Sequence, residues 1–441
     1  MSSPAATPGS VHGHPLGPDS RLAPKPGLVV VPVDGETVVY DPEADALHHL
    51  NRTASTVWSR VDGRLTLQVL AERVAADYGA TGATLSRDIV DLAGALWDRG
   101  LLSGSTTNPT AISRQSVGLG IDSGLLDGPL STPLSELRLG DQPLPESPHR
   151  TGAYRALEHV FDVATNDSTV RDFLQDVLID LAHSEVAETA RYEVLDLGAG
   201  AAGGPYLVRF NGQPVAATDW LDRALAVMLW HVNAEVVRRS TPRYPLIHAA
   251  AAVSHGVAVL LPAPAESGKT TTVAGLVRAG FGYLTDEAVA IDPRTLLAQP
   301  YPKALSVDRG SWEVLADLRP PHSDRVTGQW QLPPRSIRAD AVAEAVPVRF
   351  VVAPAYSRDA VTELVQMSKG EMLVRLADST FQFQSAPQRN LDVLARMLQQ
   401  ADCYRLTLSD LADGIRLIAD LVRSEELDVS EGELPVPQRG H

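Results

Sequence analysis

The stretch VAVLLPAPAESGKTTTVAGLVRAG, residues 257–280, decides the fold. An apolar run with strand character leads into a loop of small residues, then Gly268-Lys269-Thr270, and then a segment with helical spacing. A strand, a small-residue loop, Gly-Lys-Thr and a helix in this order form the context that a P-loop requires. We therefore predict an α/β domain whose loop N–H groups and helix N-terminus face phosphate oxygens.

The residues expected to contact a nucleotide follow one another along this loop. They are Ala265, Glu266, Ser267, Gly268, Lys269, Thr270 and Thr271. In a P-loop the lysine reaches the β- and γ-phosphates and the Thr270 hydroxyl ligates Mg²⁺. The pattern G-x-x-x-x-G-K-S/T is incomplete, because Ala263 replaces the first glycine and Pro264 offers no N–H. The alternative is an ordinary strand–turn–helix with a solvated Lys269.

Two adjacent carboxylates, Asp286 and Glu287, come where the next strand is expected to end. Such a pair can hold Mg²⁺, and one of its members can accept a hydroxyl proton. His248 lies on the strand expected before the P-loop strand, in a supporting position. Further positive charges follow in loop-like sequence, although each is individually more typical of a solvated surface. They are Lys303, Arg309, Arg335 and Arg338.

Length, charge and composition limit the classes of function. The chain has 441 residues, with 38 Lys and Arg against 54 Asp and Glu, which gives a net charge of −16. A field of this sign disfavours nucleic-acid binding. No apolar run approaches the ~18 residues of a membrane span, and the N-terminus lacks the pattern of a secretory signal. A single cysteine, Cys403, excludes a disulfide framework. We expect a cytoplasmic protein without a membrane partner.

Composition also divides the chain into segments. Residues 1–25 are rich in Pro and polar residues and are expected to form a disordered tail. A compact unit follows at 26–103, a polar linker at 104–149, the P-loop domain at 150–423 and an acidic tail at 424–441.

The compact unit of residues 26–103 shows strand patterns followed by helix patterns. GLVVVPVDGETVVYD, residues 27–41, predicts a hairpin around Asp34-Gly35, and ALHHLN at 46–51 predicts a third strand. Helical patterns follow at 53–61, 66–79 and 86–100. This order describes a winged helix-turn-helix. Its third helix carries more acidic than basic residues, so DNA reading is disfavoured.

The same residues resemble the PqqD family of peptide chaperones, also called the RiPP recognition element. The shared features are Leu50-Asn51 before the first helix, an apolar-Trp then Asp62-Gly63 after it, and the closing L-x-x-x-G-L-L. The resemblance implies that a precursor's leader peptide binds as an added strand, against the third strand and the third helix. It assigns this role to Ala46, Leu47, His48, His49, Leu50, Arg87 and Asp91. Trp97 lies either near that face or in the core.

The second unit resembles the C-terminal domain of HPr kinase/phosphorylase, whose fold is also that of PEP carboxykinase. The matching pattern is His248 before small residues, Gly268-Lys269-Thr270, and Leu284-Thr285-Asp286-Glu287. The resemblance implies that Asp286 is the general base for an acceptor hydroxyl, that His248 orients it and that Glu287 assists the metal. It implies ATP and Mg²⁺ as cofactors.

Together these features predict an ATP-dependent kinase that captures a precursor peptide by its leader and phosphorylates a Ser or Thr hydroxyl. Two alternatives remain open: a kinase of a small hydroxyl-bearing molecule, and a non-catalytic peptide chaperone that senses nucleotide. Other peptide-modifying enzymes and a second copy of this chain also remain open as partners.

A second glycine-rich segment, VLDLGAGAAGG at 194–204, has the composition of a methyltransferase motif. It runs into YLVRFNG, an alternating strand that ends in a turn signal, so we predict a hairpin loop.

Overall fold

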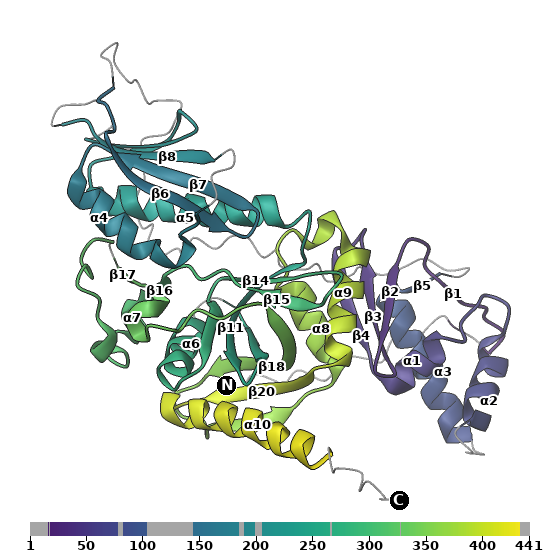
Figure 1. The fold of residues 1–441 in the computed structure, drawn as a ribbon. Coiled ribbons are helices and arrows are strands. Elements are labelled where there is room, and N and C mark those ends of the chain that lie inside the picture. Colours follow the sequence, from purple (N-terminus) through teal and green to yellow (C-terminus); the bar gives the residue numbers. More distant parts are fainter. Residues whose placement is uncertain are drawn as a thin grey trace, which may run out of the picture. The chain divides into compact units, whose positions relative to one another are not determined.

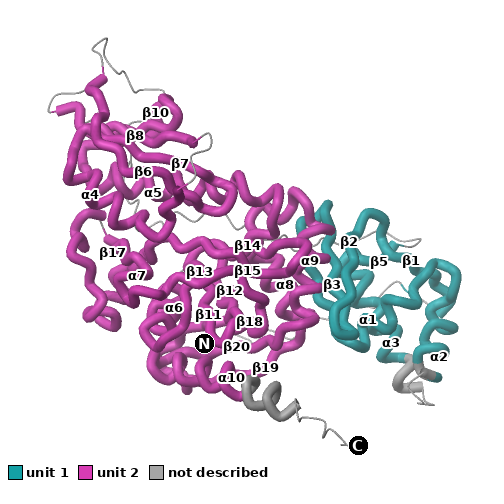
Figure 2. The backbone as a smooth tube through the Cα atoms, in the orientation of Figure 1, with its two compact units in different colours: residues 1–115 teal, residues 116–441 magenta. Residues whose placement is uncertain are grey.

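The computed structural model describes residues 16, 18–77, 83–103, 144–184, 189–198, 205–264, 267–326 and 328–432. The chain divides into two compact units, residues 1–115 and 116–441 (Figure 2). Both units combine helices with strands, so the predicted mixed α/β class is confirmed. No helix in the described ranges is both long and apolar enough to cross a membrane.

The first unit contains an antiparallel sheet of three strands in the order β2-β3-β4 (Figure 1). The strands are β2 (Val29–Val33), β3 (Glu36–Asp41) and β4 (Ala46–Leu50). Asp34 and Gly35 join β2 to β3 with φ values of 47° and 76°, the conformation of a two-residue hairpin turn. Because β4 pairs only with β3 among the described strands, it is an edge of this sheet.

Three helices complete the unit: α1 (Arg52–Trp58), α2 (Leu67–Asp77) and α3 (Ala83–Asp98). The Asn51 side chain caps α1 by accepting a hydrogen bond from the Ala54 N–H, 3.0 Å away. Gly100 has a φ of 72°, and its N–H donates to the Trp97 carbonyl as in a Schellman motif. Trp97 is 2% exposed, which places it in the core.

The predicted disordered tail of residues 1–25 is wrong for its last part. Strand β1 (Ala23–Pro24) pairs with β5 (Leu102–Ser103). Leu22 is only 4% exposed and packs in the core of the unit, and the Leu67 N–H donates to the Ser20 carbonyl. Proline does not prevent this pairing, because β1 contributes only a short edge. Residues 1–15 and 17, and the part of the predicted linker at 104–143, lie outside the described residues.

The second unit begins with a five-stranded sheet in the order β10-β9-β8-β7-β6. Its strands are β6 (His149–Ala156), β7 (His159–Thr165), β8 (Ala190–Asp196), β9 (Tyr206–Phe210) and β10 (Gln213–Thr218). Helices α4 (Ser168–Val177) and α5 (Leu221–Ser240) pack on it through a core that includes Phe161, Tyr192 and Met228. The antiparallel pairing of β8 with β9 confirms the predicted hairpin, although its loop residues 199–204 lie outside the described residues.

An eight-stranded sheet carries the rest of the unit, in the order β12-β11-β14-β15-β18-β20-β19, with β13 paired to β11. Its strands are β11 (Leu246–Ser254), β12 (Val257–Pro262), β13 (Gly282–Thr285), β14 (Ala288–Ile291), β15 (Leu297–Gln299), β18 (Val346–Tyr356), β19 (Glu363–Gln366) and β20 (Asp402–Leu408). Because β12 also pairs in parallel with β18, the sheet curls back on itself. Cys403 on β20 is buried.

The remaining elements surround this sheet (Figure 1). They are α6 (Lys269–Arg278), β16 (Leu305–Asp308), β17 (Gln329–Leu332), α7 (Pro334–Ile337), α8 (Lys369–Asp378), α9 (Pro387–Gln399) and α10 (Leu411–Gly432), with short 3₁₀ turns at Ile179–Leu181, Arg309–Ser311, Ala316–Leu318 and Phe383–Ser385. Helix α10 continues past Arg423, so the predicted acidic tail begins too early. Residues 433–441 lie outside the described residues.

Candidate functional site

The predicted strand–loop–helix is present: β12 ends at Pro262 and α6 begins at Lys269. Gly268 occupies the N-cap position with a φ of 86°, a backbone conformation that L side chains rarely adopt. Ala263 is not among the residues with positive φ, so the first glycine of the motif is not needed for this loop path. Ala265 and Glu266 lie outside the described residues.

Lys269 is only 6% exposed, so the alternative of a solvent-exposed lysine at this position is wrong. Its Nζ donates to the carbonyl oxygens of Ala263 and Pro264, each 2.6 Å away. Burial lowers the pKa of Lys269 to about 8, and Glu287 and Asp286 oppose that shift. The ammonium group therefore lies inside the curve of the loop, where it holds the two carbonyl groups together.

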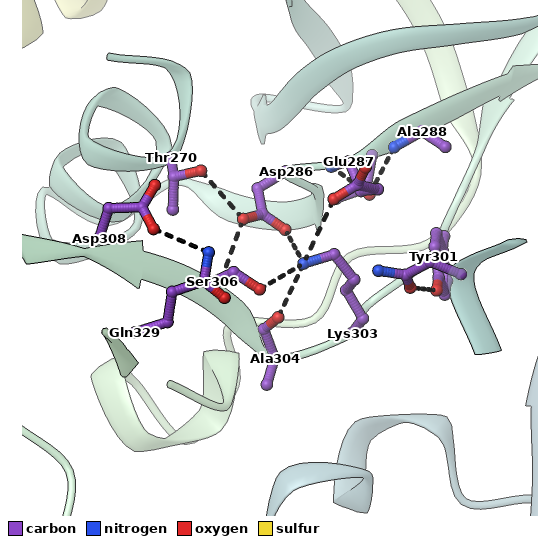
Figure 3. Close-up of polar contacts among 12 residues, drawn as sticks. Thr270, Asp286, Glu287, Ala288, Tyr301, Lys303, Ala304, Ser306, Asp308 and Gln329 are labelled. Carbon is purple, nitrogen blue, oxygen red and sulfur yellow. Dashed lines mark hydrogen bonds and ion pairs between the residues drawn. The ribbon is translucent and has the colours of Figure 1, made fainter. Parts of the chain in front are cut away.

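Asp286 accepts hydrogen bonds from residues of helix α6 and strand β16 at the centre of the site. Its Oδ2 accepts a hydrogen bond from the Thr270 hydroxyl at 3.1 Å and from the Ser306 N–H at 3.4 Å. Its Oδ1 accepts from the Tyr283 hydroxyl at 2.9 Å. The contact with Thr270 brings together two residues that the sequence predicted to share a site (Figure 3).

Lys303 is the residue whose role sequence analysis underestimated. It lies between β15 and β16, is 6% exposed, and places its Nζ 2.9 Å from Oδ1 of Asp286. The Nζ also donates to the Ala304 carbonyl at 3.0 Å and the Ser306 hydroxyl at 3.4 Å (Figure 3). Burial lowers the pKa of Lys303, but Asp286 and Glu287 more than offset it, so the pKa is raised. The available signal was a lone charge within the largely apolar run YPKAL, residues 301–305.

Glu287 lies at the edge of the same cluster. Its Oε2 is 3.8 Å from the Lys303 Nζ, and its side chain keeps 25% exposure. Burial raises the pKa of Glu287, while Lys303 acts in the opposite direction. Glu287 is therefore the more accessible of the two adjacent carboxylates.

His248 lies on β11, as expected, but it does not contact Asp286 through any hydrogen bond of the described residues. Its ring packs 5.5 Å from that of Phe381, and its Nδ1 is buried without a hydrogen-bond partner there. Burial, reinforced by Lys269, lowers the pKa of His248 to about 4, so the ring is neutral near pH 7. The orienting role that the family resemblance implies for His248 stays a prediction.

The other loop residues make local contacts. The Ser267 hydroxyl donates to the Pro264 carbonyl at 2.7 Å. The Thr271 hydroxyl lies 2.5 Å from that of Ser311, which holds the segment after β16 beside the first turn of α6.

The three predicted arginines point to other partners. Arg335 forms an ion pair with Asp180, which is far along the chain. Arg338 donates to the Phe281 carbonyl at 2.9 Å, and the Arg309 guanidinium lies 5.7 Å from the centre of the Trp312 ring. Arg309 is exposed in the segment after β16, which contacts α6 through Ser311.

The donor set of the site has the chemistry of a magnesium centre. Thr270, Asp286 and Glu287 offer hydroxyl and carboxylate oxygens, the ligands that Mg²⁺ prefers. Within the described ranges, however, no three His, Cys, Asp or Glu side chains gather closely enough to hold a metal by themselves. A metal held by Thr270, Asp286 and Glu287 would take further ligands from elsewhere, such as phosphate oxygens and water.

The residues predicted to bind a peptide lie on β4 and α3. On β4, Ala46 and Leu50 are buried, whereas Leu47, His48 and His49 are half-buried. The His49 Nε2 lies 3.0 Å from Oε2 of Glu36 on β3. Arg87 and Asp91 are exposed on α3, four residues apart and hence on one face of the helix.

Comparison with known proteins agrees with this reading of the first unit. Residues 36–102 match the family model of Coenzyme PQQ synthesis protein D (PqqD). The predicted PqqD resemblance is confirmed, although the match begins at β3 and leaves β1 and β2 outside it. The PqqD-like segment thus includes β4 and all three helices of the unit.

Two solved structures are similar to parts of the chain. One is TbiB1 in complex with the TbiA(beta) leader peptide, at 22% identity and a TM-score of 0.18, covering 19% of this chain and 99% of that one. The other is the Hpr(Ser) kinase/phosphatase from Coxiella burnetii, at 13% identity and a TM-score of 0.24, covering 42% of this chain and 98% of that one. A search of curated proteins found no match.

Proposed function

We propose that this protein is an ATP-dependent kinase of a ribosomally made precursor peptide, which it captures by the leader and phosphorylates on a Ser or Thr hydroxyl. Residues 26–103, folded as a winged helix-turn-helix, would bind the leader, and residues 150–423 would carry the chemistry. The observation that carries the proposal is the 3.1 Å contact between Thr270 at the start of α6 and Asp286 after β13. This contact places a carboxylate beside the Gly-Lys-Thr turn that would bind the nucleotide phosphates.

In the proposed reaction the acceptor hydroxyl oxygen bonds to the γ-phosphorus, and the bond from that phosphorus to the bridging oxygen of ADP breaks. The hydroxyl proton passes to Asp286. Asp286 already accepts hydrogen bonds on both oxygens, so Thr270 must turn toward the phosphates to free a lone pair on Oδ2.

The positive groups of the site would neutralise the phosphate charge. Lys269 would exchange the carbonyls of Ala263 and Pro264 for phosphate oxygens. When bound, Mg²⁺ would supply further charge neutralisation at the phosphates, with Thr270, Asp286 and Glu287 as its protein ligands. The loop residues from Ala265 to Thr271 would cradle the phosphates through their N–H groups.

Leader capture is proposed for the β4 edge, because an unpaired strand offers main-chain hydrogen bonds to an added strand. Arg87 and Asp91 would contact the leader from α3. Tethering the leader would raise the effective concentration of the core peptide at the kinase site.

Leader capture can be tested with the full chain and the fluorescent leader of a candidate precursor peptide. Leu47→Asp places an unpaired charge on the β4 edge and should weaken binding at least tenfold, which corresponds to about 1.4 kcal/mol. Val30→Asp is the matched control, since Val30 is 38% exposed on β2, the opposite edge strand. Equal losses in both variants, or none in Leu47→Asp, would contradict capture at β4.

A further inference from the structure

The Lys303 ammonium group occupies a position that would suit a metal ion. Its oxygen neighbours are two carboxylates, a backbone carbonyl and a hydroxyl, from Asp286, Glu287, Ala304 and Ser306. Oxygen ligands of these types are the ones that hard cations take in proteins. The Nζ distances of 2.9 to 3.8 Å are those of an ammonium and not of Mg²⁺, which binds oxygen at about 2.0–2.1 Å.

Burial makes it difficult for a metal ion to replace the Lys303 ammonium group beside Asp286. Lys303 is 6% exposed and Asp286 is 5% exposed, and an ion pair in such surroundings is little screened. The Tyr283 hydroxyl lies against both of them, since it donates to Asp286 Oδ1 and lies 3.2 Å from the Lys303 carbonyl. Oδ1 is thus closed to other partners, whereas Oδ2 faces Thr270 and the start of α6.

We propose that Lys303 is a built-in cation that neutralises the Asp286–Glu287 pair, so that the site takes up a divalent metal only together with nucleotide phosphates. Asp286 and Glu287 carry two negative charges, Lys303 returns one, and Lys269 adds a further positive charge nearby, so little net negative charge remains for a divalent ion. The phosphates of a nucleotide would supply the missing charge and ligands. Lys303 is a positioning residue in this account, because it acts through Asp286.

This inference deepens the proposed kinase function, and its test needs no turnover. The probe is Mn²⁺, a spectroscopic substitute for Mg²⁺, titrated into the full chain without nucleotide and followed by the electron paramagnetic resonance signal of free Mn²⁺. The wild type should bind Mn²⁺ weakly, and adding an unreactive ATP analogue should create one tight site per chain. Lys303→Met should bind Mn²⁺ at least tenfold more tightly than the wild type without the analogue. Lys303→Arg should behave like the wild type, because it keeps the charge.

The matched control is Lys369→Met, which removes a lysine at the start of α8 whose Nζ binds only the Gln399 carbonyl among the described residues. It should leave Mn²⁺ binding unchanged. Tight Mn²⁺ binding by the nucleotide-free wild type would overturn the proposal, and so would equal affinities in the wild type and Lys303→Met. If Lys303→Met fails to fold, Lys303→Gln replaces it as the uncharged variant and should show the same gain of at least tenfold. Failure of the kinase function would appear separately, as an absence of phosphoryl transfer by a wild type that binds metal and nucleotide normally.

Discussion

The Nζ of Lys303 lies 2.9 Å from Oδ1 of Asp286, and both side chains are almost wholly buried. Such a pair contributes little net stability, but removing one partner leaves an uncompensated charge inside the protein. Asp286 also receives the Thr270 hydroxyl, so the pair fixes the carboxylate against the first turn of α6. The geometry of the candidate site therefore depends on a lysine that lies outside the sequence motif.

The loop between β12 and α6 should tolerate the glycine that its motif lacks. Ala263 has no positive φ, and it is 6% exposed at the end of β12. Ala263→Gly should therefore leave ATP affinity within about twofold while lowering the free energy of unfolding by roughly 0.5–1 kcal/mol, through unfolded-state entropy. Calorimetric titration with ATP and urea denaturation would measure the two quantities. A large gain in ATP affinity would mean that the alanine distorts the loop.

The segment before β2 should be part of the folded first unit. Leu22 is 4% exposed in its core, so Leu22→Ala should lower the unfolding free energy by roughly 2–4 kcal/mol. A chain that begins at residue 26 loses β1 as well and should be less stable still than the Leu22→Ala chain. Thermal denaturation of the three chains is the measurement. Equal stability on starting at residue 26 would contradict the packing of Leu22.

Acid should destabilise the second unit through His159, which is wholly buried. Burial, reinforced by Arg239, lowers the pKa of His159 from its ordinary 6.5 to about 4, while Glu235 opposes the shift. Between pH 6.5 and pH 4 the His159 imidazole is protonated in the unfolded chain but neutral in the folded chain. The stability present above pH 6.5 is therefore lost as the pH falls toward 4. From pH 7.5 to pH 5 the loss should be about 2 kcal/mol.

His159→Phe removes this titration while keeping an aromatic ring beside Phe161, whose ring lies 5.0 Å from the imidazole. His248, whose pKa is also lowered to about 4, titrates in both chains, so the difference between them isolates His159. Urea denaturation at the two pH values should show a smaller acid loss in His159→Phe. Identical losses would assign the acid sensitivity to other groups.

Local sequence signals predicted much of this fold. The turn residues Asp34-Gly35 and Asn211-Gly212 both adopt positive φ and join hairpin strands, because few other residue pairs take that conformation without strain. The Gly-Lys-Thr turn likewise gave the start of α6, and Asp286 follows β13 as predicted.

What the sequence did not reveal depends on contacts between distant segments. Lys303 looked like a surface charge because its partner Asp286 is 17 positions away, on another strand, and only the folded sheet brings them together. Leu22 looked like part of a tail because its burial arises from pairing of β1 with β5, about eighty residues later in the chain. The contact of Arg335 with Asp180 is likewise invisible to local patterns.

The central claim is phosphoryl transfer to a captured peptide, and intact-mass spectrometry of the precursor peptide after incubation with ATP and Mg²⁺ tests it most directly. The account predicts a gain of about 80 Da, the mass of one phosphoryl group, with the wild type. Lys269→Ala and Asp286→Asn should abolish the gain while fluorescent leader still binds. An unchanged peptide mass with leader bound would contradict the kinase account, and a mass gain that persists in Asp286→Asn would contradict the assignment of Asp286 as the base.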